Sequence, residues 1–279
     1  MTRRVDLPER TDGMNVERLP ARQTPLIKLS GVAKTYRAAD GVPVKAVDSV
    51  SADIVQGEFV SILGPSGCGK STLMMMIAGL LTPSAGSVSF RGSAVNGPLR
   101  DFGVVFQDAV LLPWRNVVEN VELPGEVAGV PRGERRAASE KMLAMVGLAG
   151  FERKFPHELS GGMQQRVAIA RALSLNPTLL LMDEPFGALD AMTREQMNLE
   201  LQRISLESGA TVVFVTHSIA EAAFLSDRVF VMSGRPSTVR EIVSIDIPRP
   251  RAIDLLASDR LGIHISTLRR LLDVKGDPS

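Results

Sequence analysis

Long apolar runs are missing from this chain, and cysteine, tryptophan and tyrosine each occur only once. The single cysteine, Cys68, excludes an intrachain disulfide and is typical of a reducing compartment. The longest apolar run spans Leu73 to Leu81 and contains Gly79, whereas a membrane-spanning helix needs about 20 apolar residues. We therefore expect no transmembrane segment, so any association with a membrane must go through a partner or a surface.

An excess of charge of one sign is missing as well. The formal net charge is +1 at pH 7, so no global electrostatic field favours nucleic acid as a partner. The 279 residues are 44% hydrophobic and 23% charged, which is ordinary for a globular chain of one large or two small domains. Residues 1–25 are charged, contain prolines and show little periodicity, so we expect a disordered tail there.

Strand-like segments alternate with helical patterns along most of the chain. The predicted strands are Leu26–Ser30, Val50–Ile54, Phe59–Leu63, Ser87–Arg91, Gly103–Phe106, Thr178–Met182, Thr211–Thr216 and Arg228–Met232. Helices are predicted over Lys70–Leu81, from Pro131, after Ser160 and over Thr193–Ser208. This alternation indicates an α/β fold with a parallel core sheet, into which a helical subdomain at about residues 113–176 is inserted.

A glycine-rich loop follows the third predicted strand and leads into a predicted helix. Its pattern, Gly64-x-x-x-x-Gly69-Lys70-Ser71, is that of a phosphate-binding loop. Glycines let backbone N–H groups turn towards phosphate oxygens, and the helix N-terminus adds partial positive charge. Lys70 would reach the β- and γ-phosphates, and Ser71 would bind Mg²⁺. The predicted loop residues are Gly64, Pro65, Ser66, Gly67, Cys68, Gly69, Lys70, Ser71 and Thr72.

The apolar segment 179–182 ends in the acidic pair Asp183-Glu184. A buried parallel strand brings its last side chains to the carboxyl edge of the sheet, where ligands bind. We expect Asp183 to hold Mg²⁺, directly or through water. Glu184 would orient or deprotonate the attacking water, a contribution typically worth about 10² to 10⁴ in rate.

A second helix start lies at Ser160, which is a good N-cap and precedes Gly161 and Gly162. Such a start is an anion site. The chain already has one anion-binding helix start at Lys70, so the helix start at Ser160 would need a different phosphate. The economical answer is the γ-phosphate of a nucleotide held by another subunit, and the alternative is a capped helix without a ligand.

The order of these motifs resembles a known family. Residues 159–166 read Leu-Ser-Gly-Gly-Met-Gln-Gln-Arg and lie between the glycine-rich loop and the acidic pair. This run is similar to the signature of ABC-type ATPases, and the resemblance extends from about Leu26 to Arg249. It implies a P-loop NTPase core with a parallel sheet, an N-terminal antiparallel β layer and an inserted helical subdomain. It also implies ATP and Mg²⁺ as cofactors and a dimer in which each signature grips the partner's ATP.

The resemblance assigns further residues. Gln107 matches a glutamine that senses Mg²⁺ and the membrane partner, and His217 matches a histidine that contacts the γ-phosphate. Tyr36 matches an aromatic residue that stacks on adenine, although packing in a β layer remains its alternative. Gly187 stands where serine is frequent, which leaves one hydrogen bond in doubt. We therefore predict catalytic roles for Glu184, His217, Gln107 and Lys70, metal binding by Ser71, Gln107 and Asp183, and nucleotide binding by the loop residues together with Tyr36, Ser160, Gly161, Gly162, Gln164 and Asp190, the last in the dimer-contact loop Ala188–Asp190.

Two segments resemble importers of the nitrate, sulfonate and taurine group. They are Leu111–Val117, which follows Gln107, and Asn96–Pro98 before it. In the family the first region faces the membrane subunits, so Trp114 is interpreted as a contact residue, with a core position as its alternative. The resemblance implies transmembrane permease partners, an indirect link to a solute-binding protein, and a peripheral location at the cytoplasmic face of the cell membrane.

The expected organisation is a tail at 1–25, an ABC ATPase domain at 26–250 and a C-terminal helical extension at 251–279. Leu261, Ile265, Leu268 and Leu272 share one helical face in that extension. Two other functions are alternatives: a soluble ABC-type ATPase of DNA repair or cluster assembly, and a P-loop kinase for a small metabolite. The sequence has no basic aromatic patch, which argues against the DNA-repair function. The kinase function would leave residues 159–166 without a role.

Overall fold

The computed structural model describes residues 24–37 and 41–273. The tail predicted at residues 1–25 falls almost wholly on residues 1–23, and the last part of the predicted extension falls on 274–279. Both lie outside the described residues. In the described part of the chain, no helix has the length and apolar composition that a membrane span requires.

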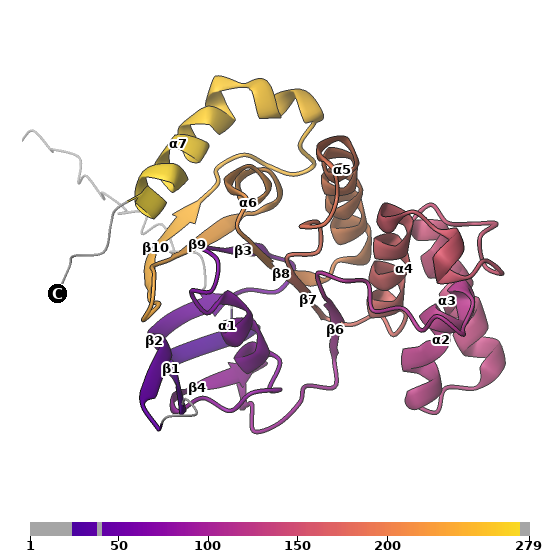
Figure 1. Ribbon diagram of the computed structural model, residues 1–279, viewed down its shortest axis with the longest axis horizontal. Coiled ribbons are helices and arrows are strands. Elements are labelled where there is room, and N and C mark those ends of the chain that lie inside the picture. The colour runs from indigo at the N-terminus through magenta and orange to yellow at the C-terminus, as the bar shows by residue number, and fades with distance from the viewer. Residues whose placement is uncertain (1–23, 38–40, 274–279) are drawn as a thin grey trace, which may run out of the picture.

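A six-stranded sheet forms the centre of the molecule (Figure 1). Its order is β10-β9-β3-β8-β7-β6, and all neighbouring pairs are parallel except β10 with β9. The strands are β3 (Phe59–Leu63), β6 (Phe102–Val105), β7 (Leu179–Asp183), β8 (Thr211–Thr216), β9 (Arg228–Met232) and β10 (Val239–Ser244). Every residue of β3 and β8 is buried, which explains why these segments are mostly apolar rather than alternating. The predicted parallel core sheet is confirmed.

A second, antiparallel sheet is formed mainly by the N-terminal part of the described chain. Its order is β2-β1-β4-β5. The strands are β1 (Ile27–Arg37), β2 (Pro43–Ile54), β4 (Ala85–Phe90) and β5 (Ser93–Ala94). Strands β1 and β2 are longer than predicted. The parts that were not predicted contain exposed polar residues, which hide the strand pattern in the sequence.

Seven α-helices are described in residues 24–37 and 41–273. They are α1 (Lys70–Ile77), α2 (Val117–Val127), α3 (Arg132–Met145), α4 (Gly161–Leu173), α5 (Ala191–Ser208), α6 (Ile219–Leu225) and α7 (Asp259–Asp273), with the 3₁₀ turns η1 (Pro156–Glu158) and η2 (Ile253–Ala257). Helices α2, α3 and α4 lie together beside the edge strand β6 (Figure 1). The domain boundaries given above stay a prediction.

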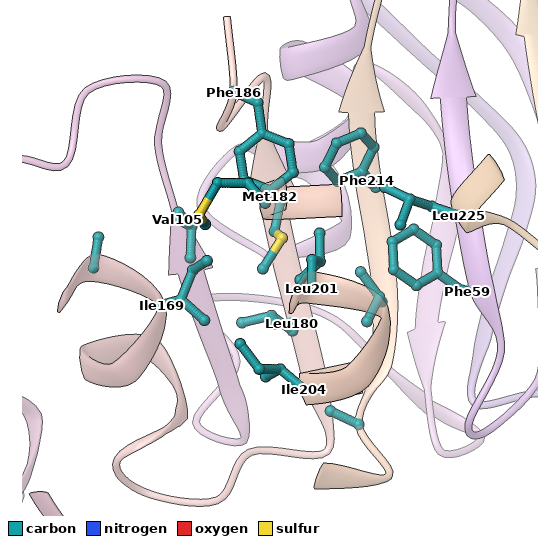
Figure 2. Close-up of a cluster of buried hydrophobic side chains, with 14 of the residues drawn as sticks. Phe59, Val105, Ile169, Leu180, Met182, Phe186, Leu201, Ile204, Phe214 and Leu225 are labelled. Atoms are coloured by element: carbon teal, nitrogen blue, oxygen red, sulfur yellow. The ribbon is translucent and has the colours of Figure 1, made fainter. Parts of the chain in front are cut away.

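The buried core holds the strand ends in place. The ring of Phe214 on β8 lies between Phe59 on β3 and Phe186, with centroids 5.9 and 5.8 Å away (Figure 2). Phe186 is buried and belongs to the loop directly after β7. Truncating a buried phenylalanine costs about 3–5 kcal/mol. Phe186 comes two residues after Glu184, so its burial fixes the loop that Glu184 begins.

Candidate functional site

The glycine-rich loop joins β3 to α1 and lines a cavity of about 530 Å³. Its conformation depends on glycine at position 69, where φ is +115° and an added Cβ would lie 2.9 Å from the carbonyl oxygen of Ala46. A side chain there would meet both a strained backbone and a fixed neighbour. The loop contributes Ser66, Gly67, Gly69, Lys70, Ser71 and Thr72 to the cavity, and Gln107, Asp183, Glu184 and Arg235 complete the lining.

Lys70 is buried at the base of this cavity, with 4% of its side chain exposed. Its Nζ donates hydrogen bonds to the carbonyl oxygens of Gly64 (3.0 Å) and Pro65 (3.1 Å). It also lies 3.3 Å from Oε1 of Glu184. The loop and the acidic strand end, 114 positions apart in the sequence, are therefore joined by a charge pair at one site, as the motifs predict.

Glu184 has an unusual backbone conformation for a glutamate, with φ of +46°. Its N–H donates to the carbonyl oxygen of Val215 (2.9 Å), so it still pairs with β8 before the chain turns. The Oε2 atom lies 2.8 Å from Nδ1 of His217. Strained residues of this kind cost about 1–3 kcal/mol and are concentrated at functional sites. The turn aims the carboxylate at both Lys70 and His217.

Ser71 and Asp183 face each other, and Ser71 Oγ donates a 3.0 Å hydrogen bond to Asp183 Oδ1. Burial raises the pKa of Asp183 above its ordinary value, and the Ser71 hydrogen bond opposes this. A hydroxyl and a half-buried carboxylate are suitable oxygen ligands for Mg²⁺, which takes few protein ligands and completes its shell with water and phosphate. The described residues contain no group of three or more His, Cys, Asp and Glu side chains that could hold a metal alone. The pair therefore fits a Mg²⁺ ion that is shared with a nucleotide.

Gln107 follows β6 and lines the cavity beside the loop after β7. A Cβ at Gly187 would lie 3.2 Å from Gln107 Nε2, so glycine leaves room for this amide where a serine would press against it. Gln165 on α4 donates to the carbonyl oxygen of Phe106 (3.0 Å). Through this bond, the helix that begins after Ser160 is tied to the residue directly before Gln107.

The helix start at Ser160 lies apart from this cavity, because Ser160, Gly161 and Gly162 are not among its lining residues. Ser160 Oγ accepts a hydrogen bond from Met163 N (3.3 Å), which is the predicted N-cap. The side chain of Gln164 is turned towards the carbonyl oxygen of Pro156 (2.9 Å). Within one copy these residues cap a helix. Their predicted ligand would have to come from elsewhere.

Asp190 is likewise an N-cap, on α5, and accepts hydrogen bonds from the N–H and hydroxyl of Thr193 (3.0 and 2.7 Å). These bonds lower the pKa of Asp190 below its ordinary value. Tyr36 is close to the loop, with its hydroxyl 3.4 Å from Thr72 Oγ1 and 40% of the residue exposed. An exposed ring here leaves a face for a base, whereas a ring packed in the β layer would be buried.

Cys68 lies within the glycine-rich loop. Its side chain is buried, and this burial raises the pKa of the thiol above 9.0 despite the opposing charge of Lys70. The helix N-terminus therefore does not lower the pKa as it does at reactive cysteines. Cys68 is a small residue that packs beneath the loop, where its Sγ lies near Gly64.

Comparison with known proteins decides the family. The profile described as ABC transporter matches residues 47–187. An ABC transporter ATP-binding protein of Methanocaldococcus jannaschii is 49% identical over 81% of this chain and 84% of its own length. The chain belongs to the ABC transporter family. The taurine import ATP-binding protein of Yersinia pestis is 49% identical over 79% of this chain and 85% of its own. The nitrate import ATP-binding protein of Synechococcus elongatus is 49% identical over 74% of this chain and 32% of its own.

Solved ABC structures have the same fold. A dimeric bacterial ABC transporter cassette aligns with a TM-score of 0.68 and 38% identity, covering 80% of this chain and all of the cassette. A post-hydrolysis dimer bound to ADP and phosphate aligns with a TM-score of 0.67 and 36% identity over the same shares. This chain is therefore an ABC ATPase subunit that binds and hydrolyses ATP. The alternative function of a small-metabolite kinase is wrong.

Glu221 was not predicted from the sequence, although it links two loops of this ABC ATPase next to Glu184 and His217. Thr216 donates a 2.6 Å hydrogen bond to the buried carboxylate of Glu221, on the helix that follows His217. Arg194 Nε lies 3.6 Å from Glu221, and its NH2 donates to the carbonyl oxygen of Leu189 (2.8 Å). The histidine segment and the 186–190 loop are joined in this way. The spacing Ser218-x-x-Glu221, typical of a helix start, was the available signal.

Proposed function

We propose that two copies of this ABC ATPase close around two ATP–Mg²⁺ and that hydrolysis drives the import of a small anion through membrane subunits. The observation that carries the proposal is the division of the site. Lys70, Glu184, Ser71 and Asp183 line one cavity, whereas the helix start at Ser160 lies outside it. A second copy that turns this helix start towards the cavity would complete the γ-phosphate contacts. The dimeric form of the similar cassette supports this arrangement.

Each residue of the composite site has a proposed role, which the geometry supports. The loop and Lys70 bind the phosphates, and Ser71 and Asp183 would hold Mg²⁺, which supplies charge neutralisation between the β- and γ-phosphates when bound. Glu184 orients the attacking water and accepts its proton. His217, in contact with Glu184, would contact the γ-phosphate. Because Lys70 is paired with Glu184 in this structure, phosphate oxygens that attract Lys70 would release Glu184 for its role as a base.

The proposed contact with membrane subunits lies after Gln107. Val110 and Trp114 are 60% and 71% exposed, which rules out the core position considered for Trp114. Arg171 on α4 fixes the backbone beneath them by donating to the carbonyl oxygens of Ala109 and Val110, both at 2.8 Å. A rigid backbone with apolar side chains directed outwards is suited to a protein contact. The same segment connects to the cavity through Gln107, which makes it a route for motion from the nucleotide.

The proposed solute is a taurine-like or nitrate-like anion, and the proposed site of action is the cytoplasmic face of the membrane beside permease subunits, served by a solute-binding protein. The support is the name of two relatives, one for taurine import and one for nitrate import, together with the Leu111–Val117 resemblance. The cavity residues are assigned to the nucleotide and not to the transported anion, so the choice of solute is assigned to the other subunits.

A mixing experiment tests the shared site. Lys70→Ala disables the phosphate loop, and Gly161→Asp places a carboxylate where the partner's phosphate would bind. The aspartate fits, because a Cβ at Gly161 would be 3.8 Å from its nearest neighbour, Leu189, and acidic residues suit a helix N-terminus. Each variant alone should be inactive. A mixture should recover about a quarter of wild-type turnover per chain, because random pairing leaves one intact composite site in half of the dimers. No recovery would contradict the shared site.

A further inference from the structure

An arginine from outside every motif reaches the phosphate cavity. Arg235 belongs to the loop between β9 and β10, and its guanidinium Nε donates a 2.5 Å hydrogen bond to the carbonyl oxygen of Gly67. The side chain lines the same cavity as Lys70 and Ser71. The guanidinium NH2 lies 3.8 Å from the position of a Cβ at Gly67. The other described lining residues come from the glycine-rich loop and α1, the acidic strand end and Gln107.

The loop that carries Arg235 is fixed at both sides. Ser233 N donates to Thr238 O (3.0 Å), and Thr238 N donates to Ser233 Oγ (2.9 Å), which closes residues 233–238 into a tight turn. Ser237 is fully buried, and its N–H and hydroxyl both donate to the carbonyl oxygen of Ala46 on β2 (3.2 and 2.9 Å). Asp48 N in turn donates to Ser237 O (2.8 Å). The backbone at Arg235 is thus pre-organised, so little ordering cost would accompany a ligand contact.

The charges in the cavity leave a role for this arginine. Two carboxylates, Asp183 and Glu184, face one lysine, Lys70, which is already paired with Glu184 at 3.3 Å. Without Arg235 the charged lining would carry one net negative charge, and with it the lining is neutral. ATP and ADP are anions, so a cation that is not committed to a carboxylate favours their binding. Arg235 is bonded to a backbone carbonyl, which keeps its charge available.

We propose that Arg235 is a nucleotide-binding residue that braces the glycine-rich loop and supplies a second cation to the phosphates. Gly67 is in the middle of the loop, where the backbone cradles the α- and β-phosphates. Arg235 therefore serves the phosphates that ATP and ADP share, whereas Lys70 also reaches the γ-phosphate. It takes no part in the attack on the γ-phosphate. The inference rests on the nucleotide site proposed above and adds a residue to it.

Steady-state kinetics of the full chain test this role. Arg235→Ala should raise the KM for ATP about tenfold and leave kcat within about twofold, since it removes binding common to ground and transition states. The Kd values for ADP and ATP should rise by the same factor. Arg235→Lys, which keeps the charge, should stay within about threefold of wild type, and Arg235→Gln, which keeps a donor without the charge, should behave like Arg235→Ala. Arg260→Ala is the control, because Arg260 is an exposed arginine with one backbone carbonyl partner, Asp246, and it should match wild type.

Several results would overturn the inference. An unchanged Kd for ADP in Arg235→Ala, a wild-type Kd in Arg235→Gln, or a loss confined to kcat would each show that the guanidinium does not serve the shared phosphates. Without nucleotide, the melting temperature of Arg235→Ala should fall only slightly, because a single exposed hydrogen bond to Gly67 is lost. Arg235→Lys provides the comparison if Arg235→Ala is unstable. Failure of the nucleotide site itself would look different: wild type would then bind no nucleotide, and Lys70→Ala would make no difference.

Discussion

The Nδ1 atom of His217 lies 2.8 Å from Oε2 of Glu184, and Lys70 Nζ lies 3.3 Å from the other carboxylate oxygen. The carboxylate is held between two partners that come from different strand ends, after β8 and after β3. In the proposed site, each partner would instead contact a phosphate. The pair His217–Glu184 therefore connects phosphate binding with the positioning of the base.

Glu184→Gln should bind ATP with an affinity close to wild type and hydrolyse it at least about 10²-fold more slowly, because glutamine cannot accept the proton. Without turnover the closed dimers should accumulate. Size-exclusion chromatography with ATP and Mg²⁺ would show the shift to dimer, and phosphate release would show the rate. Normal turnover in this variant would remove Glu184 from the proposed role.

His217→Ala should lower kcat by about 10² or more while the affinity for ADP stays unchanged, since ADP lacks the phosphate that the histidine contacts. Binding of ADP, followed by calorimetry, separates this effect from damage to the loop. His157→Ala is a suitable control, because His157 lies in η1 and its ring stacks on Phe155 at 6.0 Å, away from the cavity. An equal loss of ADP affinity in His217→Ala would contradict the assignment.

Asp183→Asn should raise the melting temperature of the nucleotide-free protein by about 2 °C at pH 7. Burial raises the pKa of Asp183 above its ordinary 3.8, so ionisation at higher pH costs stability, and this cost fades as pH falls towards 3.8. The advantage of the variant should shrink over the same range. Thermal unfolding from pH 8 to pH 4 would show the trend.

Two comparisons make the Asp183 test specific. Asp190→Asn should not raise the melting temperature, because hydrogen bonds lower the pKa of Asp190 and so stabilise its ionised form, and because asparagine is also a good N-cap. With Mg²⁺ and ATP, wild type should have the higher melting temperature of the two. Asp183→Asn loses a metal ligand, while wild type gains stability from the bound nucleotide. A variant that remained more stable than wild type under saturating Mg²⁺–ATP would contradict metal binding by Asp183.

Tyr36→Ala should raise the KM for ATP and GTP alike, by about fivefold or more, because stacking is worth about 1–3 kcal/mol per base and every base has a π-face. Tyr36→Phe and Tyr36→Trp should remain near wild type, since the ring is kept and only the 3.4 Å contact with Thr72 is altered. Inorganic triphosphate binding should be unaffected by all three. If Tyr36→Phe were as damaged as Tyr36→Ala, the hydroxyl rather than the ring would be the important group.

The phosphate loop and the acidic strand end were predictable because each motif is contiguous and lies at a strand end that an apolar run marks. Glu184, Lys70 and Asp183 meet in one cavity because β3 and β7 are parallel and flank β8. Helix α2 was not predicted, since Pro124 and Gly125 interrupt its pattern, although Asn116 and Glu119 form a capping box at its start.

Arg235 and Glu221 could not be predicted in the same way. Arg235 reaches Gly67 across 168 positions of sequence, and nothing in the neighbouring Gly-Arg-Pro residues indicates that the loop folds over a phosphate site. Such contacts depend on how β2 and the 233–238 turn pack. The helix start at Ser160 is a third case. The sequence predicted its position correctly, but the ligand proposed for it would depend on the geometry of a second copy.

The exposure of Trp114 gives this chain an intrinsic optical probe. No other tryptophan is present in the sequence, so all indole emission reports a single position that is 71% open to solvent. Its spectrum should be that of hydrated indole in the free subunit and should shift to shorter wavelength when a permease covers it. Titrating a detergent-solubilised, tryptophan-free permease variant into the untagged subunit would thus yield an association curve without any label, and the same signal would report on ATP turnover in the assembled transporter.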